Sequence, residues 1–99
     1  MRNVELTLAA EEDLINTWLY TYETWGIDQA EKYYDLIVSC CEAIGGSKPR
    51  SKPVEGLPDD IRVHNCERHY IFFIPQEHPV ILAILHERMD FVHRLKDRL

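Results

Sequence analysis

The sequence predicts an α+β domain in which a helical hairpin packs on one face of a small, mostly antiparallel sheet. Residues 9–25 and 28–44 carry apolar side chains at helical spacing, with two residues between them. Residues 61–86 hold three short, apolar runs joined by short turns, which is typical of a strand meander. Ninety-nine residues, 45% of them hydrophobic, suit a single domain, so we assign residues 1–99 to one unit.

The first expected strand is residues 4–8, VELTL, where apolar and polar side chains alternate. A helix is predicted to begin at Ala9, with Thr7 or a neighbour as its cap. The helix dipole favours negative charge in the first turn, where the sequence has Glu11, Glu12 and Asp13. Its apolar stripe comprises Leu14, Ile15, Trp18, Leu19, Tyr22 and Trp25. Gly26 ends this helix, because glycine readily adopts a left-handed conformation.

The second helix is predicted to begin at Asp28, which forms with Glu31 a D-x-x-E variant of the capping box. Its apolar face comprises Ala30, Tyr33, Tyr34, Ile37, Cys41 and Ile44. Gly45 and Gly46 end it. Because so short a link joins the two helices, we expect an antiparallel hairpin.

Residues 45–60, GGSKPRSKPVEGLPDD, are predicted to form a loop, since they hold three glycines and three prolines. Three further strands are predicted, at residues 61–66, 69–74 and 80–86. Together with the N-terminal strand they form a four-stranded sheet. Residues 91–99 form a short terminal helix with Asp90 as the N-cap. Basic side chains near its C-terminal end suit the dipole: Arg94, Lys96 and Arg98.

The net charge of −6 is unevenly distributed along the chain. Residues 1–46 hold 2 basic and 9 acidic side chains, whereas residues 47–99 hold 9 basic and 8 acidic ones. A protein that wraps nucleic acid needs a dominant positive surface, which this balance does not supply. The acidic first half indicates either a protein partner or a solvated helical surface.

Location and cysteine chemistry are also constrained by the sequence. No stretch approaches 18 apolar residues and the N-terminal segment soon turns acidic, so neither a membrane span nor a secretory signal is expected. We therefore expect a cytoplasmic protein. Cys40, Cys41 and Cys66 are odd in number and lack a C-x-x-C spacing, so we expect three free thiols, mostly in the core.

The segment HERMD, residues 86–90, contains the residue types of an acid/base site. A structural interpretation is favoured, in which Asp90 caps a helix, Arg88 pairs with a neighbour and His86 ends a strand. Nucleotide-binding and zinc-protease motifs are missing, and the five histidines have no metal-ligand spacing. Pairing of Cys66 with His64 lacks an orienting third group. We therefore expect no catalytic residue, metal or cofactor.

Aromatic residues on the expected hairpin have two interpretations. Ten aromatics in 99 residues are many for a hairpin that covers one face of a small sheet. The residues in question are Trp18, Tyr22, Trp25, Tyr33 and Tyr34. Each is either core or part of a partner surface, and core is the more common outcome.

Four stretches together resemble the ParE branch of the ParE/RelE toxin superfamily. They are LAAEEDL at 8–14, YETWG followed by QAEKY at 22–33, RHYIFF at 68–73, and ILHERMD at 84–90. The last is the most specific, and the match covers roughly residues 2–94. The resemblance implies the same element order that the residues predict independently.

The resemblance implies a bacterial type II toxin, without enzymatic turnover, that inhibits DNA gyrase. It also implies neutralisation by a ParD-like antitoxin in a hetero-oligomer, and a role in plasmid stabilisation. The RelE branch instead cleaves ribosome-bound messenger RNA. The acidic charge and the absence of tyrosine after Asp90 favour the gyrase-directed branch. An RNase remains one alternative, since Arg62, Arg88 and Lys52 are able to form a small basic cluster. A non-toxic protein-binding module is the other.

Two sets of site residues follow from this interpretation. A disordered antitoxin segment can dock as a helix in a groove and as a strand at a sheet edge. We therefore predict antitoxin contacts at Trp18, Tyr22, Tyr33, Ile37, Ile61 and Val63. Contacts with the target are predicted at Arg62, His86, Arg88, Asp90 and Arg94. No membrane contact and no direct sequence-specific nucleic-acid binding are expected.

Overall fold

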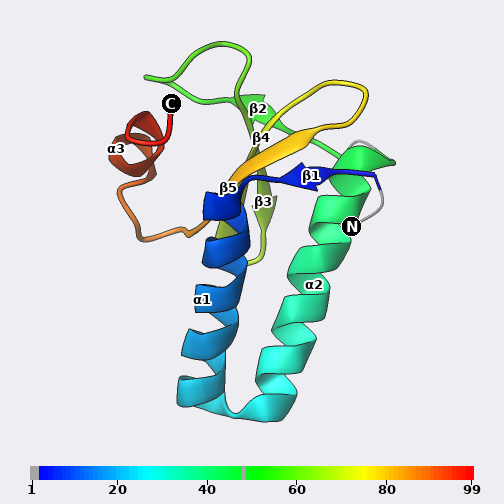
Figure 1. Cartoon of the computed structure of the whole chain (residues 1–99), viewed down its shortest axis with the longest axis vertical. Helices are drawn as coiled ribbons and strands as arrows, with labels where there is room; N and C mark the ends of the chain where they lie inside the picture. Colours follow the sequence, from blue (N-terminus) through cyan, green and yellow to red (C-terminus); the bar gives the residue numbers. More distant parts are fainter. Residues whose placement is uncertain (1–2, 48) are drawn as a thin grey trace.

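The computed structural model describes residues 3–47 and 49–99, and it confirms the predicted α+β fold (Figure 1). The elements are β1 (Glu5–Leu6), α1 (Leu8–Trp25), α2 (Ile27–Gly45), β2 (Lys52–Pro53), β3 (Arg62–Cys66), β4 (His69–Ile74), β5 (Val80–His86) and α3 (Phe91–Lys96). β4 and β5 have the predicted bounds, whereas β1 is shorter than expected and α3 ends three residues earlier. β2 was not predicted.

The sheet has five strands in the order β1-β5-β4-β3-β2. β1 pairs in parallel with β5, and every other pair is antiparallel. The prediction of a mostly antiparallel sheet is therefore confirmed, with one strand more than expected. The two long helices run side by side and extend well past the end of the sheet, as Figure 1 shows.

The ends of the two helices explain the tight hairpin. The Thr7 hydroxyl accepts a hydrogen bond from the Ala10 backbone N–H at 3.1 Å, which confirms the predicted cap. Gly26 has φ 92°, and its N–H donates to the Tyr22 carbonyl oxygen at 2.9 Å. α2 follows directly at Ile27, so Gly26 alone connects the helices. The predicted capping box at Asp28 is wrong, because Gly26 occupies the N-cap position and has no side chain to accept a bond.

Both faces of the sheet are covered, because successive strand residues point to opposite sides. On β4, Ile71 packs under the hairpin while its neighbour Phe72 faces the other side. The core under the hairpin comprises Val4, Ala10, Leu14, Ile37, Cys41, Ile44, Cys66, Ile71, Phe73, Ile81 and Ile84. The opposite core comprises Val54, Leu57, Ile61, Val63, Phe72, Ala83, Leu85 and Leu95. α3 and the segment before β3 therefore cover the second face.

A bulge at Leu82 of β5 joins three parts of the chain, because this residue pairs with none in β4. Its carbonyl oxygen accepts hydrogen bonds from the Thr7 hydroxyl at 3.3 Å and from Arg98 at 3.1 Å. The Arg98 guanidinium also forms a bidentate ion pair with Asp13, at 2.8 and 2.9 Å. Asp13 additionally accepts from the Ile84 N–H at 2.9 Å. This network fixes the start of α1 and the end of the chain on β5.

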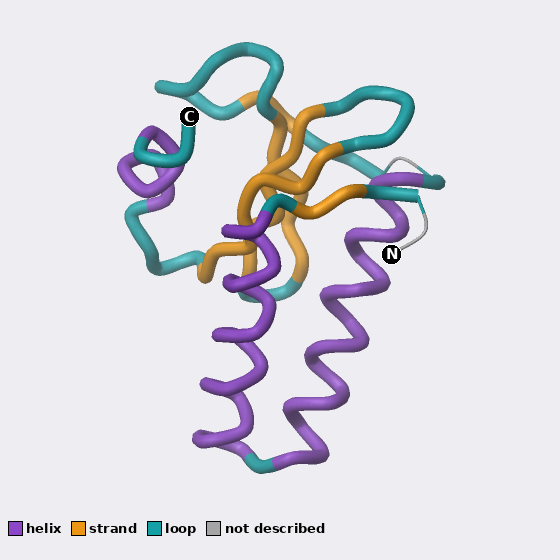
Figure 2. Tube along the Cα trace, in the orientation of Figure 1, coloured by secondary structure: helices purple, strands orange, loops and turns teal. Residues whose placement is uncertain are grey.

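The predicted loop at 45–60 is partly a strand, because Lys52 and Pro53 pair with β3 (Figure 2). Arg62 holds the segment by donating from Nε to the Ser51 hydroxyl at 2.7 Å and from Nη2 to the Ser51 carbonyl at 2.6 Å. β3 is consequently an inner strand. The expectation that it offers a free edge to a partner is wrong.

The expectation of three free thiols is also wrong. Cys40 of α2 and Cys66 of β3 form a disulfide, with their Cα atoms 6.3 Å apart. These residues lie 26 positions apart in sequence, and only the packing of α2 on the sheet brings them together. Cys41 is a free, buried thiol, and burial raises its pKa to about 12.

Candidate interaction site

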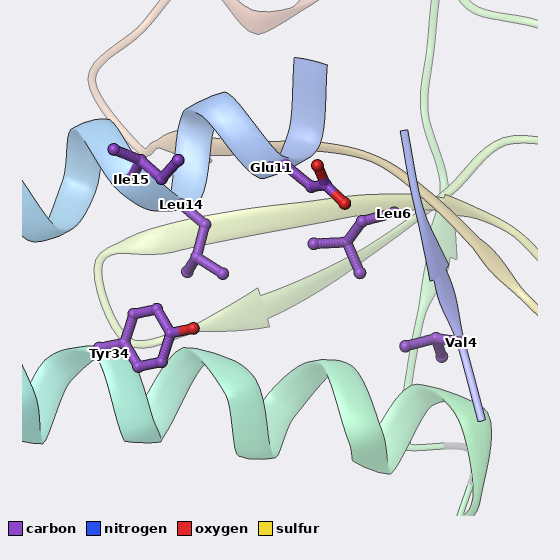
Figure 3. A pocket seen from close by; sticks show the side chains of 6 residues that line it. All are labelled: Val4, Leu6, Glu11, Leu14, Ile15 and Tyr34. Carbon is purple, nitrogen blue, oxygen red and sulfur yellow. The ribbon is translucent and has the colours of Figure 1, made fainter. Parts of the chain in front are cut away.

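The open side of the hairpin carries a hollow of about 440 Å³ between α1, α2 and β1. Leu14 of α1 and Tyr34 of α2 point into the space between the two helices, and Leu6 of β1 lies beside them (Figure 3). The lining residues are Val4, Leu6, Glu11, Leu14, Ile15 and Tyr34. The lining is apolar apart from Glu11 and the tyrosine hydroxyl.

A second hollow of about 310 Å³ continues toward the tip of the hairpin. It is lined by Ile15, Trp18, Glu31 and Tyr34, so it shares Ile15 and Tyr34 with the first. We refer to the two hollows together as the hairpin groove. It follows the seam between α1 and α2 for at least the distance from Glu11 to Trp18, which is roughly 10 Å at the rise of an α-helix.

Small side chains are buried on both helices, whereas larger apolar side chains beside the groove are exposed. Ala10 and Thr21 of α1 and Ala30 of α2 are buried. The Thr21 hydroxyl is satisfied within α1 by donating to the Thr17 carbonyl oxygen at 2.8 Å. Ile15 is 57% exposed and Tyr34 38% exposed, and their burial by a partner would be favourable.

Most of the predicted apolar stripe of α1 is outside the core. Leu14 is buried, but Leu19, Tyr22 and Trp25 are exposed to 44, 47 and 71%. The rings of Trp18 and Tyr22 stack with centroids 5.3 Å apart and planes 8° apart. The hairpin tip lies beyond the sheet in Figure 1 and has no sheet residues to pack against. The core interpretation is therefore wrong for Tyr22 and Trp25, whose rings lie outside the core.

The predicted antitoxin contacts divide into two groups. Trp18 lines the hairpin groove, and Tyr22 lies next to it on the exposed stripe. The other group is internal: Ile37, Ile61 and Val63 are 0, 1 and 8% exposed and belong to the two cores. These three side chains are not surface residues in the folded chain, and we do not retain them as contacts.

Tyr33 is half-buried and belongs to a polar row under α2. Its hydroxyl is hydrogen-bonded to His69 Nδ1 at 2.6 Å, and His69 packs edge-on against His86 with ring centroids 5.2 Å apart. Burial lowers the pKa of His69 to about 4, and the positive charge that His86 can carry acts in the same direction. Burial raises the pKa of Tyr33. Both groups are therefore neutral near pH 7, and Tyr33 has an internal role.

The predicted target contacts do not form one cluster. His86, Arg88 and Asp90 lie together where β5 leads into α3: His86 Nδ1 accepts from the Arg88 N–H at 3.2 Å, and Asp90 caps α3 by accepting from the His93 N–H at 3.3 Å. Arg94 follows on α3 and is exposed. Arg62 pairs with Phe73, whereas His86 pairs with His69, four residues along β4. This separation is roughly 13 Å along β4, so Arg62 lies apart from His86 on the sheet.

The structure tests the nucleophile–base pair and the metal site that were weighed from the sequence. His64 Nδ1 is hydrogen-bonded to the Arg50 backbone oxygen, and Cys66 is oxidised, so the Cys66–His64 pair is not a nucleophile and base. Within residues 3–47 and 49–99, no cluster of three or more His, Cys, Asp or Glu residues is arranged to hold a metal ion. Within the same ranges, no helix combines the length and apolar character required to cross a bilayer.

Residues 4–91 match the model of a known family, described as the ParE toxin of the type II toxin-antitoxin system, parDE. The chain belongs to this ParE toxin family. It is 36% identical over 96 residues to Toxin ParE of Escherichia coli, which covers 95% of this chain and 93% of that protein. The resemblance drawn from the four sequence stretches is thereby confirmed, and the chain is the toxin component of a type II toxin–antitoxin system.

More distant ParE relatives agree with this assignment. The chain is 27% identical over 90 residues to Toxin ParE1 of Caulobacter vibrioides, covering 91% of this chain and 94% of that one. It is 26% identical over 87 residues to Toxin ParE1 of Mycobacterium tuberculosis, covering 86 and 89%. A solved structure described as the chromosomal ParDE TA system from P. aeruginosa has the same fold, with a TM-score of 0.71 and 20% identity over 87% of this chain and 98% of that one.

Sequence reasoning missed several residues of the groove. Glu11 and Glu31 were assigned only to helix termini, and Val4 and Leu6 only to a strand. Ile15 and Tyr34 were recognised as apolar, but the periodicity of each helix alone cannot distinguish its buried edge from its open edge. The available signal was the small residues Ala10, Thr21 and Ala30, which are buried on the two helices while larger apolar neighbours are exposed.

Proposed function

We propose that this toxin inhibits DNA gyrase in the cytoplasm by binding it, without substrate turnover, and that a ParD-like antitoxin neutralises it by occupying the hairpin groove. The observation that carries the docking site is the combination of an open apolar groove with an adjoining aromatic stripe. An antitoxin helix that covered Ile15, Trp18 and Tyr34 would remove exposed apolar surface on both partners.

The target contacts are proposed at a different surface, where β5 leads into α3. His86, Arg88, Asp90 and Arg94 remain our candidates there. Arg88 and Arg94 are exposed and form no ion pair among the described residues, so both are available to a partner. Arg62 is less suited, because its guanidinium is occupied by Ser51.

A gyrase assay with purified toxin tests the target. The toxin should inhibit supercoiling by gyrase and produce linear DNA from cleaved complexes, and prior addition of the antitoxin should abolish both effects. A ParD-like antitoxin, sought as the product of an open reading frame next to the toxin gene, serves in this experiment. Arg88→Ala and Arg94→Ala should weaken inhibition, whereas Arg50→Ala, an exposed arginine in the segment between α2 and β2, serves as the matched control.

The same protein in a translation extract tests the alternative. A ribosome-dependent RNase would shorten the messages, and a gyrase inhibitor would leave them intact. Cleaved messages together with normal supercoiling would overturn the proposed target. A chain that affected neither gyrase nor messages, and did not impair a bacterial host, would contradict inhibition of gyrase by this toxin.

A further inference from the structure

The charges around the hairpin groove all have one sign. Glu11 lies on the α1 wall and Glu31 on the α2 wall, both exposed, and none of the residues lining the groove is basic. The whole hairpin, residues 8–45, is strongly acidic. Its acidic residues are Glu11, Glu12, Asp13, Glu23, Asp28, Glu31, Asp35 and Glu42, against the single basic residue Lys32.

The two glutamates lie at defined positions relative to the middle of the groove. Ile15 and Tyr34 line both hollows and therefore mark the centre. Glu11 precedes Ile15 by four residues and Glu31 precedes Tyr34 by three. Because the helices are antiparallel, these offsets run in opposite directions along the groove. Counted from the connecting residue Gly26, Glu11 lies 15 residues along α1 and Glu31 lies five residues along α2. At the rise of an α-helix the two carboxylates are therefore separated along the groove by roughly 15 Å, which corresponds to about ten residues of a helical partner.

We propose that the groove selects an amphipathic helix with two basic residues about three turns apart, flanking apolar residues that cover Ile15 and Tyr34. This inference rests on the proposed function, since the occupant is taken to be the antitoxin segment. It adds the chemistry and spacing of that segment. The apolar contacts supply the general attraction, and the two ion pairs, at opposite ends and on opposite walls, fix the register and exclude acidic helices.

Charge argues against other occupants of the groove. A second copy of this chain would bring its own acidic hairpin to an acidic surface, where like charges oppose association. Nucleic acid would face the same repulsion from its phosphates. A basic helix, in contrast, gains both favourable steering and paired charges. The proposal therefore commits to a heterologous, basic partner helix.

Two designed peptides test this inference directly. Each is a helix-forming peptide of roughly 18 residues with an identical leucine face, with either two lysines or two glutamates about three turns apart on that face. Binding to the full-length chain is followed by tryptophan fluorescence in a Trp25→Phe background. Trp18, which lines the groove, is then the single reporter.

The lysine peptide should bind more tightly than the glutamate peptide, and added salt should reduce the difference. Glu11→Lys and Glu31→Lys should each weaken the lysine peptide roughly tenfold, because an attraction becomes a repulsion of similar size. Glu23→Lys is the matched control, with the same change in charge on α1 outside the groove, and should alter binding less than about twofold. The double variant Glu11→Lys/Glu31→Lys should prefer the glutamate peptide.

Equal binding of both peptides, or equal effects of Glu23→Lys and the two groove variants, would overturn the inference. Self-association of the toxin that the peptides do not disrupt would do the same. Gyrase inhibition by each variant is measured without peptide, which separates this inference from the proposed function. Selective peptide binding without gyrase inhibition would contradict only the proposed target. Gyrase inhibition without charge-selective peptide binding would contradict only the inferred preference of the groove for a basic helix.

Discussion

Two carboxylates near the start of α1, Glu11 and Asp13, lie two residues apart and have opposite roles. Glu11 is exposed, lines the hairpin groove and forms no ion pair among the described residues. The Asp13 side chain is 12% exposed, forms an ion pair with Arg98 and accepts a hydrogen bond from the Ile84 N–H. Two helical residues differ by about 200° around the axis, so one faces the groove and the other faces β5. The side of the helix, more than the residue type, decides which carboxylate stabilises the fold and which is available to a partner.

The same contrast appears on α2 between adjacent tyrosines. Tyr33 is hydrogen-bonded to His69 beneath the helix, whereas Tyr34 lines the groove. Cys40 lies on the inner side with Tyr33 and joins α2 to β3. Substitutions on the inner sides of both helices should therefore reduce stability. Substitutions on the groove sides should reduce partner binding while the fold persists.

The largest stability change is expected from reduction of the Cys40–Cys66 disulfide. The bond closes a loop of 26 residues, and the entropy of that loop in the unfolded chain corresponds to about 3.5 kcal/mol. Urea unfolding of the oxidised and reduced protein measures the difference. The Cys40→Ser/Cys66→Ser variant is the control and should be insensitive to reductant. A midpoint independent of redox state in the native chain would mean that this bond does not contribute to stability.

Asp13→Ala should lower the free energy of unfolding by about 3 kcal/mol, because it leaves the largely buried Arg98 guanidinium without its partner and the Ile84 N–H without an acceptor. Glu11→Ala should change it by about 0.5 kcal/mol, the scale of a helix-dipole contribution. Thermal or urea unfolding of the two variants tests the contrast. Equal losses would show that the two sides of α1 do not differ in the way proposed.

His69 should make the stability depend on pH. Its folded pKa of about 4 lies below the value of about 6.5 expected when unfolded, so the unfolded chain binds the proton first. Stability is complete above pH 6.5 and decreases as the pH falls toward 4, by about 2 kcal/mol between pH 6.5 and 4.5. His69→Gln should remove this component from unfolding curves measured across that range. His78→Gln, an exposed histidine in the β4–β5 turn, should retain it.

Periodicity and turn residues predicted most of the elements, because β4, β5 and the two long helices follow local patterns. Local patterns could not reveal contacts made across the fold. The two-residue strand β2 depends on pairing with β3, and the partner of Cys40 is 26 positions away. The Asp28 capping box failed because α2 begins at Ile27, directly after Gly26, so Asp28 already lies inside the helix. For the candidate site, sequence reasoning named Trp18, which lines the groove, and the adjoining Tyr22, but it also chose the buried Ile37, Ile61 and Val63, since an apolar residue gives no sign of which face it occupies.

A small stability change, with the most specific functional effect, is expected on the groove side of α2. Tyr34→Ser should alter the free energy of unfolding by less than about 1 kcal/mol, because the ring is already 38% exposed. Gyrase inhibition should persist, since the groove is separate from the proposed target surface. Binding of the antitoxin should weaken by roughly thirtyfold or more, the loss typical of a central aromatic contact.

Tyr20→Ser is the matched control, because Tyr20 is 66% exposed on α1 and lines neither hollow of the groove. It removes the same aromatic surface without touching the groove, so antitoxin binding should be retained. Co-expression in a bacterial host provides the measurement: the antitoxin should rescue growth with the Tyr20 variant and fail with the Tyr34 variant. Rescue of both would show that the antitoxin docks elsewhere, and the separation between the inner and groove sides of the hairpin would then have no functional meaning.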